Sequence, residues 1–290
     1  MIIKQEATND VVARSFCTGF SELDKLMRIT AGNVIVIAAR PSMGKSALSL
    51  NILTNIAKCR EGEAVFFSAE MPSDQLMNRL ASAETSVNLT SIRKGELSVD
   101  EWARMQRFSS EEKNMPLTIV GNSNLNIIEM RTQLNRIKRE TGGKLSAIGI
   151  DYLQLMEDII GQHKVDNVST IIRTLKALGH EFGCPVFLLS QLSRDVEKRF
   201  NKHPIMSDLR DSCAIEKDAD IITMIYRNDH YEQIEKGNSA KLDGMADIII
   251  LKNTNGPTGT VRLGFEGQYS RFTNHMPAMH GLDEMPSHGD

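Results

Sequence analysis

The stretch Ala39-Arg40-Pro41-Ser42-Met43-Gly44-Lys45-Ser46 decides the fold of this 290-residue chain. It follows a β-branched run, NVIVIAA at residues 33–39, and precedes a helical pattern, ALSLNILTNIAK at residues 47–58. It matches the phosphate-loop pattern G-x-x-x-x-G-K-[ST] except at its first position, which is Ala39. A strand-to-helix turn points backbone N–H groups and the positive end of a helix dipole at an anion. This context argues against a helix start capped for stability alone. We predict a phosphate site formed by Arg40, Pro41, Ser42, Met43, Gly44, Lys45 and Ser46.

Side chains in and near this loop predict a nucleotide hydrolase. Lys45 would reach the outer phosphates, and the hydroxyl of Ser46 would bind Mg²⁺. Asp151 ends the run LSAIGID, and Glu70 follows AVFFSA. Because ligands collect at the carboxyl ends of strands in open α/β sheets, we expect Asp151 to hold Mg²⁺ with Ser46. Glu70 is then suited to polarise a water for attack on the γ-phosphate. The amide of Gln191, which ends PVFLLSQ, is a weaker candidate for a γ-phosphate contact.

Strand and helix patterns alternate along most of the chain. Apolar runs without polar alternation are typical of strands that are buried on both faces of a mostly parallel sheet. They span residues 33–39, 64–69, 145–151, 185–190, 219–226 and 246–251. Helices are predicted within residues 73–83, 99–108, 127–137 and 171–182. Residues 260–265 and 268–272 flank Gly267 and predict a closing antiparallel hairpin. We therefore predict an α/β fold with helices on both faces of the sheet.

The composition limits the class of protein. Hydrophobic residues make up 41% of the chain and charged residues 24%, as in a globular domain with a sizeable core. No apolar run reaches about 18 residues, and no signal peptide opens the chain, so we expect a cytoplasmic protein without membrane contact. The net charge of −3 gives no support for nucleic-acid binding and does not exclude a locally basic groove. The cysteines, which form no C-x-x-C pair, are expected to be reduced structural thiols: Cys17, Cys59, Cys184 and Cys213.

Seven stretches resemble the C-terminal motor domain of the DnaB family of replicative helicases over residues 18–274. They are TGFSELDKLM, ARPSMGKS, FSAEMP, IDYLQLM, LSQLSRDVEKR, SDLRDSCAIEKDAD and NGPTGTVRLGF. The first two are shared with other RecA-like ATPases, whereas IDYLQL, SQLSR and the SDLRDS–DAD pair are specific. The family also tolerates alanine at the position of Ala39. The resemblance implies a RecA-like P-loop NTPase core that binds ATP and Mg²⁺.

The resemblance also implies an assembly and a set of roles. Subunits would form a hexameric ring with ATP at each junction and single-stranded DNA in the central channel. Lys45 would bind phosphate, Glu70 would be the catalytic glutamate, Asp151 the metal-site acid, and Gln191 the γ-phosphate sensor coupled to DNA. The expected activity is ATP-driven translocation on single-stranded DNA and unwinding of duplex at the replication fork. A helicase loader is a further candidate partner.

DNA contacts are expected between Gln191 and Glu216. Residues 194–210 hold five basic and three acidic residues, which fits either a solvated surface or a segment that follows phosphates. We favour the second, because the family places its DNA loops here. The candidate DNA-binding residues are Arg194, Lys198, Arg199, Arg210, Asp211 and Cys213. The family usually has Glu and Gly at positions 211 and 213, and a Cβ at Cys213 alters how closely the backbone can approach a phosphate.

Two further departures from the family affect assembly and catalysis. The family motif K-x-R-N-G, whose lysine and arginine reach a neighbour's ATP, reads Lys252-Asn253-Thr254-Asn255-Gly256 here. Lys252 is a candidate catalytic residue, but Thr254 replaces the arginine, so we expect slow hydrolysis. Residues 1–17 are read as a linker remnant in place of the family's N-terminal helical domain, and residues 275–290 as a disordered tail. The resemblance therefore does not extend to primase contact, and ring formation without help stays open.

Two alternatives remain. A RecA- or RadA-type recombinase, or a KaiC-like ATPase, shares the fold and the phosphate loop, although the SQLSR and SDLRDS–DAD stretches argue against it. A nucleotide-regulated assembly module without autonomous unwinding is the second, and Thr254 and the short N-terminal segment keep it open.

Overall fold

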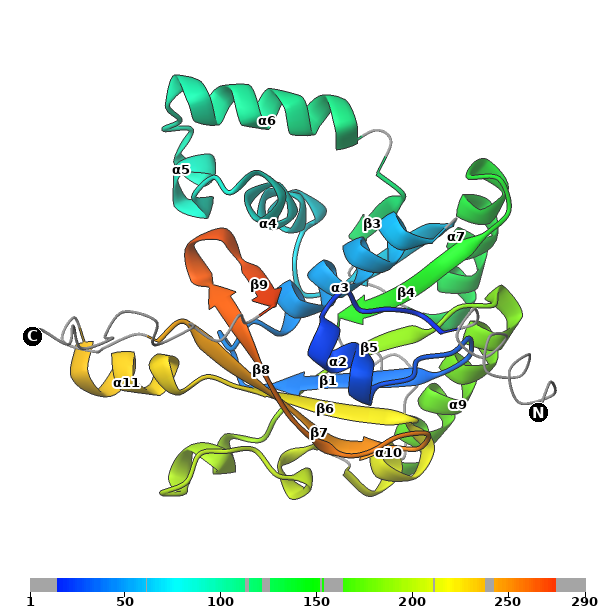
Figure 1. The fold of residues 1–290 in the computed structure, drawn as a ribbon. Coiled ribbons are helices and arrows are strands. Elements are labelled where there is room, and N and C mark those ends of the chain that lie inside the picture. Colours follow the sequence, from blue (N-terminus) through cyan, green and yellow to red (C-terminus); the bar gives the residue numbers. More distant parts are fainter. Residues whose placement is uncertain are drawn as a thin grey trace, which may run out of the picture.

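The computed structural model describes residues 15–60, 62–112, 115–121, 126–151, 153, 164–210, 212–237 and 243–274, without the side chains of residues 112 and 164–167. The strands are β1 (Val34–Ala39), β2 (Glu63–Ser68), β3 (Leu117–Gly121), β4 (Leu145–Asp151), β5 (Val186–Gln191), β6 (Ile221–Tyr226), β7 (Met245–Asn253), β8 (Gly259–Glu266) and β9 (Arg271–Asn274). They form one sheet in the order β3-β2-β4-β5-β1-β6-β7-β8-β9 (Figure 1). The first six strands in this order, which end at β6, are parallel to one another. The last three, β7, β8 and β9, are each antiparallel to the strand before them.

Helices surround this sheet. The α-helices are α2 (Ser21–Leu26), α3 (Lys45–Cys59), α4 (Ser73–Thr85), α5 (Leu89–Lys94), α6 (Val99–Glu112), α7 (Ile127–Glu140), α9 (Lys164–Phe182), α10 (Ser212–Asp218) and α11 (Asn228–Lys236). Short 3₁₀ turns are η1 (Arg194–Lys198), η2 (Met206–Asp208) and η4 (Gly267–Tyr269). None of the helices in the described part of the chain is long and apolar enough to cross a membrane.

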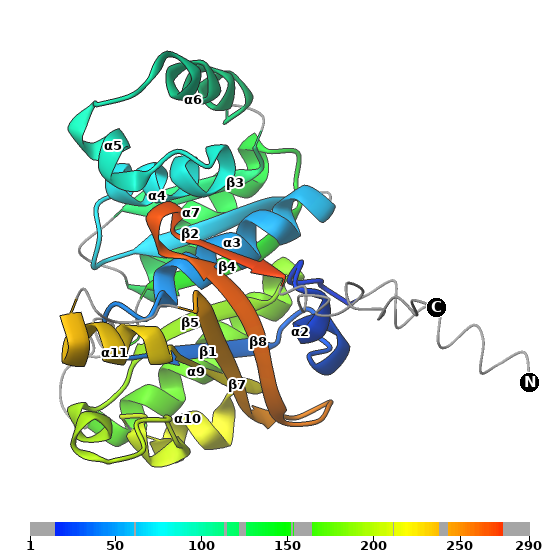
Figure 2. The same cartoon turned by 60° about the vertical axis from the view of Figure 1, so that its left-hand side comes forward.

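The central strands are covered on both faces, as their unalternating sequences predict. Along β1, Ile35 and Ile37 join one core with α3 and α4, whereas Val34 and Val36 join another with α7, α9 and α10. Successive side chains of a strand point to opposite faces, so an all-apolar strand needs two covered faces. Figure 2 shows α5 and α6 beyond α4, away from the sheet. Of the described side chains of α6, only Phe108 is buried.

Two strands differ from the prediction. β7 covers residues 246–251, but it is antiparallel to its neighbours and its burial alternates. On one face of β7, Ile248 and Ile250 are buried in the first core. On the other face, Leu251 is only partly buried against the second core. This apolar run therefore has one fully covered face, not two. β3 was not predicted. It is a short edge strand in which only Leu117 is buried, and edge strands carry a weak apolar signal.

The remaining predicted elements are present. The hairpin is confirmed as β8 and β9, joined by η4. The predicted helices correspond to α3, α4, α6, α7 and α9, whereas α2, α5, α10 and α11 were not predicted. None of these four is longer than nine residues, too short to repeat the helical period clearly. Residues 1–14 and the tail from 275 to 290 lie outside the described residues.

Candidate functional site

The predicted phosphate loop connects the end of β1 to the start of α3, at the carboxyl edge of the parallel strands. Ser42 and Gly44 have left-handed backbone conformations, with φ of 64° and 98°. A Cβ at Gly44 would also lie 2.9 Å from the ring of Phe272, so glycine is required there. Ala39, in contrast, is a buried strand residue in register with Gln191. The left-handed positions of the loop fall after Ala39, which explains why alanine can replace the first glycine of the pattern.

Lys45 and Ser46 both contact the carboxylate of Asp151. Lys45 Nζ donates a hydrogen bond of 2.9 Å to Asp151 Oδ1, and Ser46 Oγ donates one of 2.6 Å to Asp151 Oδ2. Asp151 is completely buried, and only 13% of the Lys45 side chain is exposed. A buried carboxylate needs such partners, because burial of an unpaired charge is costly. The fold therefore brings together the residues predicted to bind phosphate and metal.

Glu70 lies just after β2, at the rim of the same site. Its Oε2 atom is 3.9 Å from Lys45 Nζ, and 53% of its side chain is exposed. The backbone around it is held: Ser68 Oγ bonds to both the N–H and the C=O of Met71, and Ala69 N–H donates to Asp151 O. A carboxylate at this rim is open to water and close to the lysine predicted to bind phosphate, as a water-polarising residue must be.

These residues surround a cavity of about 280 Å³. Its lining consists of Ala39, Arg40, Pro41, Ser42, Gly44, Lys45, Ser46, Glu70, Met71, Arg79 and Gln191. Met43, which the sequence assigned to this site, is absent from the lining because its side chain is buried in the core. Arg40 is part of the lining, but its guanidinium donates to Leu192 O and pairs with Glu197. Arg40 therefore ties the phosphate loop to η1.

Arg79 is a cavity residue that the sequence analysis missed. It lies on α4, and its Nε atom is buried without a hydrogen-bond partner among the described residues. Burial lowers the pKa of its guanidinium and Arg93 lowers it further, against the opposing effect of Asp151 and Glu70. A signal was present: Arg79 lies three residues after Leu76 and one before Leu80, on the apolar face of the predicted helix 73–83. A half-buried guanidinium that lines a cavity and has an unused donor is suited to bind an anion.

The outer side of the phosphate loop packs against the β8–β9 hairpin. Phe265 and Phe272 are the nearest side chains to Gly44. The guanidinium of Arg227 stacks on the Phe265 ring at 4.1 Å and donates a 3.2 Å hydrogen bond to Ser42 O. These residues follow the loop by more than 180 positions, and no local pattern connects them to it.

Residues 192–210, in the segment between Gln191 and Glu216 that is expected to bind DNA, run through η1 and η2 towards α10. A β-bridge between Leu192 and Leu209 closes the base of this stretch. Arg199 donates two hydrogen bonds, of 3.0 Å and 2.6 Å, to the carboxylate of the buried Asp208. This fork makes Arg199 an internal brace of the loop.

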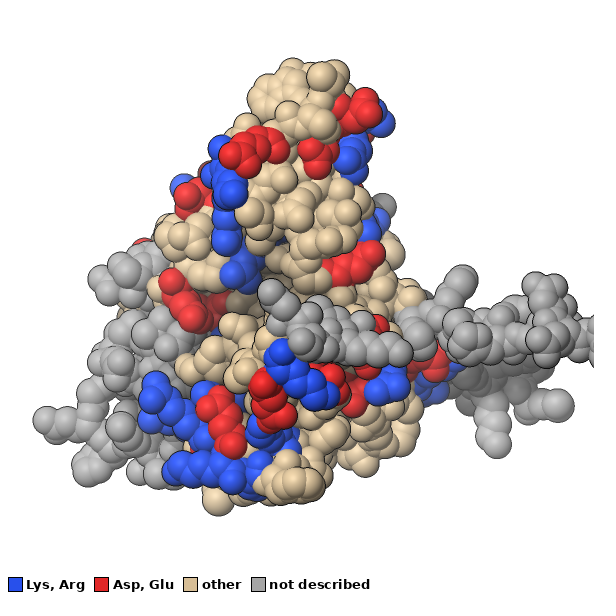
Figure 3. Space-filling model, turned by 90° about the vertical axis from the view of Figure 1, so that its left-hand side faces the viewer, with Lys and Arg blue, Asp and Glu red and all other residues tan. Residues whose placement is uncertain are grey.

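Two lysines of the segment also form ion pairs. Lys198 pairs with Asp195 at 2.7 Å, and Lys202 pairs with Glu235 at 2.8 Å. Figure 3 shows a mixture of basic and acidic side chains on the face where this segment lies. Among the described residues, Arg194 and Arg210 are exposed and make no ion pair. Cys213 is exposed at the start of α10, and Asp211 lies outside the described residues.

Lys252 lies on the side of the sheet where the parallel strands begin, opposite to the side where they end at the cavity. Its neighbour Asn253 pairs with Ile221, the first residue of β6, whereas the cavity lies beyond the last residues of β1 and β5. Lys252 Nζ donates hydrogen bonds of 2.6 Å and 2.7 Å to Glu216 O and Ala219 O. It does not reach the cavity of its own chain, and its role at a neighbour's cavity stays a prediction.

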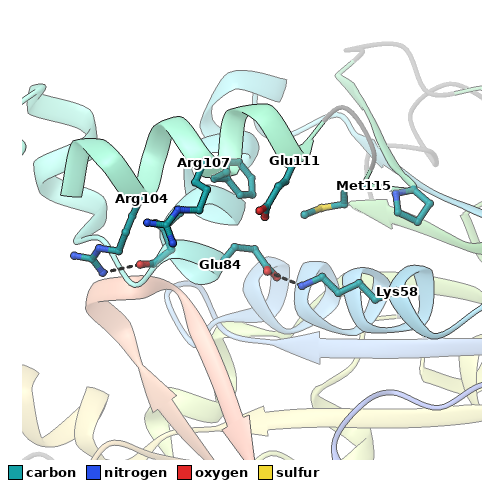
Figure 4. A pocket seen from close by; sticks show the side chains of 9 residues that line it. Lys58, Glu84, Arg104, Arg107, Glu111 and Met115 are labelled. Atoms are coloured by element: carbon teal, nitrogen blue, oxygen red, sulfur yellow. Dashed lines mark hydrogen bonds and ion pairs between the residues drawn. The ribbon is translucent and has the colours of Figure 1, made fainter. Parts of the chain in front are cut away.

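A larger cavity of about 520 Å³ lies between α6, α4 and the end of α3 (Figure 4). Its lining mixes Lys58, Arg104 and Arg107 with Glu84 and Glu111, and Lys58 pairs with Glu84. This described lining includes no glycine-lysine loop and no strand-end carboxylate. The smaller cavity is therefore the better candidate for a nucleotide.

Comparison with known proteins gives the family. The model of the DnaB-like helicase C-terminal domain matches residues 15–274. A probable replicative DNA helicase from Trieres chinensis is 39% identical over 277 residues, which are 94% of this chain and 60% of that protein. The replicative DNA helicase DnaB of Geobacillus stearothermophilus is 40% identical over 263 residues, 89% of this chain and 56% of that protein. The chain thus spans about 60% or less of these relatives.

Solved structures agree. One described as an ATPase domain has a TM-score of 0.83 at 31% identity and covers 95% of this chain and 97% of its own. A DnaB-like replicative helicase, described with its interactions with primase, has a TM-score of 0.81 at 32% identity over 90% of this chain and 62% of its own. A KaiC-like protein from Pyrococcus horikoshii OT3 scores 0.59 at 14% identity, over 91% of this chain and 99% of its own, and shows the shared RecA-like fold alone. With these matches, the chain belongs to the family of DnaB-like helicase C-terminal domains.

Proposed function

We propose that the chain is the ATP-hydrolysing motor of a replicative DNA helicase, which moves along single-stranded DNA and unwinds duplex. The observation that carries this proposal is the contact of Lys45 and Ser46 with the buried Asp151, with Glu70 3.9 Å from Lys45. Phosphate binding, metal binding and water activation each need one of these groups. Lys45, Ser46 and Glu70 line one cavity, and Asp151 is bonded to two of them.

The residues of this cavity fit a Mg²⁺ ion. The hydroxyl of Ser46 and a carboxylate oxygen of Asp151 are 2.6 Å apart, and both are hard oxygen ligands of the kind that Mg²⁺ prefers. When bound, the ion neutralises charge that develops on the phosphates. Lys45 then provides a second positive charge beside it.

Hydrolysis would depend on Glu70 and on its neighbour Arg79. Glu70 is half exposed at the rim of the cavity, so it can orient a water and accept its proton. Arg79 lies close enough to influence Glu70 electrostatically, and its buried Nε has no partner among the described residues. Its guanidinium would hold the carboxylate in place and gain its missing hydrogen bond when an anionic ligand enters the cavity.

Two contacts are suited to carry the state of the nucleotide to DNA. Gln191 lines the cavity, and the DNA-facing loop begins at the next residue. Arg40 donates to Leu192 O and pairs with Glu197 in η1. A change at the phosphate loop would therefore act on residues 192–197 directly.

We propose single-stranded DNA and further copies of this chain as partners, in a hexameric ring that works in the cytoplasm. The place of Lys252, at the opposite edge from its own cavity, suits an action on a neighbouring subunit. A helicase loader is a further candidate. An interaction with primase is described for a relative of which this chain covers 62%, and we do not propose it for this chain.

The test is ATP turnover with and without single-stranded DNA, together with strand displacement and mass in solution with nucleotide. We expect DNA-stimulated turnover, a ring-sized mass, and loss of hydrolysis in Lys45→Ala. Lys58→Ala, which removes a lysine outside the cavity, is the matched control. A chain that binds ATP but neither hydrolyses it nor displaces a strand, alone or with DNA, would contradict the proposal.

A nucleotide-regulated assembly module is the second candidate, favoured by Thr254 in place of the family's arginine. It predicts that nucleotide changes the mass in solution while strand displacement stays absent.

A further inference from the structure

The end of β7 is bonded to the end of α10. Lys252 Nζ donates to Glu216 O at 2.6 Å and to Ala219 O at 2.7 Å. Thr254 donates twice to Asp220 O, from its N–H at 3.0 Å and from Oγ1 at 2.9 Å. All of these acceptors are backbone carbonyls in the last turn of α10 or in its connection to β6.

These bonds meet a specific need of α10. The last four carbonyls of an α-helix have no partner within the helix, and a cation there also interacts favourably with the helix dipole. α10 has only seven residues, and helices this short depend on tertiary contacts for their stability. Lys252 therefore serves as the C-terminal cap of α10.

The opposite side of this segment is held by α9. Arg173 pairs with Asp218 at 3.0 Å, and Lys176 pairs with the carboxylate of Asp220 at 2.6 Å. The end of α10 is therefore fixed between α9 and β7. At its beginning, Cys213 is exposed, three residues after the exposed Arg210.

We infer that Lys252 and Thr254 are positioning residues for the DNA-binding segment of their own chain. By holding the end of α10, they set the direction in which its first turn and Arg210 face the nucleic acid. This inference rests on the proposed DNA contact at residues 210–213. It gives Lys252 a task within one chain, apart from any contact with a neighbour's nucleotide.

The test is made without nucleotide. A lysine that acts only on a neighbour's phosphate then has no partner, so its removal should change nothing. Hydrogen–deuterium exchange of the full chain is compared for the wild type, Lys252→Ala, Lys252→Arg and Thr254→Val. In Lys252→Ala we expect amides of residues 212–220 to exchange about tenfold faster, the change that corresponds to the loss of a charge-assisted hydrogen bond. Thr254→Val should show a smaller increase, because a neutral hydrogen bond is lost. Lys252→Arg should restore protection, since arginine can also donate to both carbonyls.

Lys58→Ala is the control for the loss of a lysine charge, because Lys58 pairs with Glu84, away from α10. Exchange in Lys252→Ala that equals the wild type in residues 212–220 overturns the inference. Thr254→Val and Lys252→Arg keep the test valid if Lys252→Ala does not fold.

Affinity for labelled oligothymidylate, also without nucleotide, is the second readout. We expect Lys252→Ala to bind roughly three- to tenfold more weakly, with Lys252→Arg near the wild type. If the wild type binds and Lys252→Ala binds equally well, the positioning role is wrong. If the wild type binds no single-stranded DNA either with or without nucleotide, the proposed function fails, and with it the role in DNA binding. The exchange data then still decide whether Lys252 caps α10.

Discussion

The candidate nucleotide cavity and residues 192–210 lie at the same edge of the sheet, but their charges are held in different ways. In the cavity, Lys45 meets Asp151 from more than 100 positions away in the sequence, and Asp151 is fully buried. In the segment, Lys198 meets Asp195 three positions away, and both side chains are more than two-thirds exposed. The Lys45–Asp151 pair depends on the tertiary fold, whereas the Lys198–Asp195 pair is local and exposed.

This difference predicts how each region responds to substitution. Removing one partner of a buried pair leaves an uncompensated charge, which is costly, whereas an exposed pair contributes only about 0–1 kcal/mol. Changes in the cavity should therefore nearly abolish an activity. Changes at exposed charges of the segment, such as Lys198 and Arg210, should act gradually and depend on salt.

The largest effect is expected in the cavity, from Glu70→Gln. The amide cannot accept a proton from water, so turnover should fall about 10²- to 10⁴-fold while ATP binding is retained. Steady-state turnover and nucleotide titration measure the two properties. Glu96→Gln is the control, because Glu96 is an exposed glutamate paired with Lys94. Normal hydrolysis by Glu70→Gln would show that another group activates the water.

Arg79→Lys should have the next largest effect. Lysine keeps the charge but lacks the planar set of donors, so turnover should fall roughly tenfold to a hundredfold, as for other residues that orient a reactive group. Arg107→Lys, in the larger cavity, is the matched control. A normal turnover number for Arg79→Lys would leave Arg79 with a packing role only.

Thr254→Arg tests the opposite edge of the sheet. Because an arginine that reaches a neighbour's γ-phosphate stabilises transition-state charge, we expect DNA-stimulated turnover to rise tenfold or more, from a slow wild-type rate. Another arginine, such as Arg227 or Arg262, could replace the missing one. Arg227 is bonded to the phosphate loop of its own chain, whereas Arg262 pairs with Asp247 and is more exposed. Arg262 is therefore the better candidate. An unchanged or lower rate with an intact ring would favour such a substitute.

The smallest effects distinguish two arginines within the segment proposed to bind DNA. Arg210→Gln should weaken binding of single-stranded DNA about equally on all sequences and lower the salt slope by roughly one unit. Arg199→Gln removes the fork to Asp208 and should lower the melting temperature by a few degrees, which Arg210→Gln should not do. Salt titrations of affinity and thermal unfolding provide both comparisons. Equal melting temperatures for the two variants would mean that the fork adds nothing to stability.

Most of the fold could be predicted because buried parallel strands have a strong local signal. Residues 145–151 were predicted with the bounds that β4 has. The exceptions have weak or ambiguous signals: β3 is a half-buried edge strand, and an all-apolar β7 looks the same with one covered face as with two. The length of α10 and the other short helices prevented their detection.

The cavity could be predicted in part for a similar reason. Asp151 and Gln191 end neighbouring strands whose carboxyl ends meet at one edge, so their proximity to Lys45 follows from the topology. Arg79 was detectable as a charge on an apolar helix face. Arg227 was not, because only the path of the chain beyond β6 brings it to the phosphate loop.

By itself, the sequence determined where the predicted phosphate loop lies and which family the chain belongs to, because both depend on contiguous stretches of residues. Only the tertiary structure decided that Arg199 is a brace while Arg210 remains exposed, and that Lys252 caps α10. The physical reason is range. Hydrogen bonds act over about 3 Å, and whether a side chain finds a carbonyl or carboxylate at that distance depends on segments that no local pattern connects.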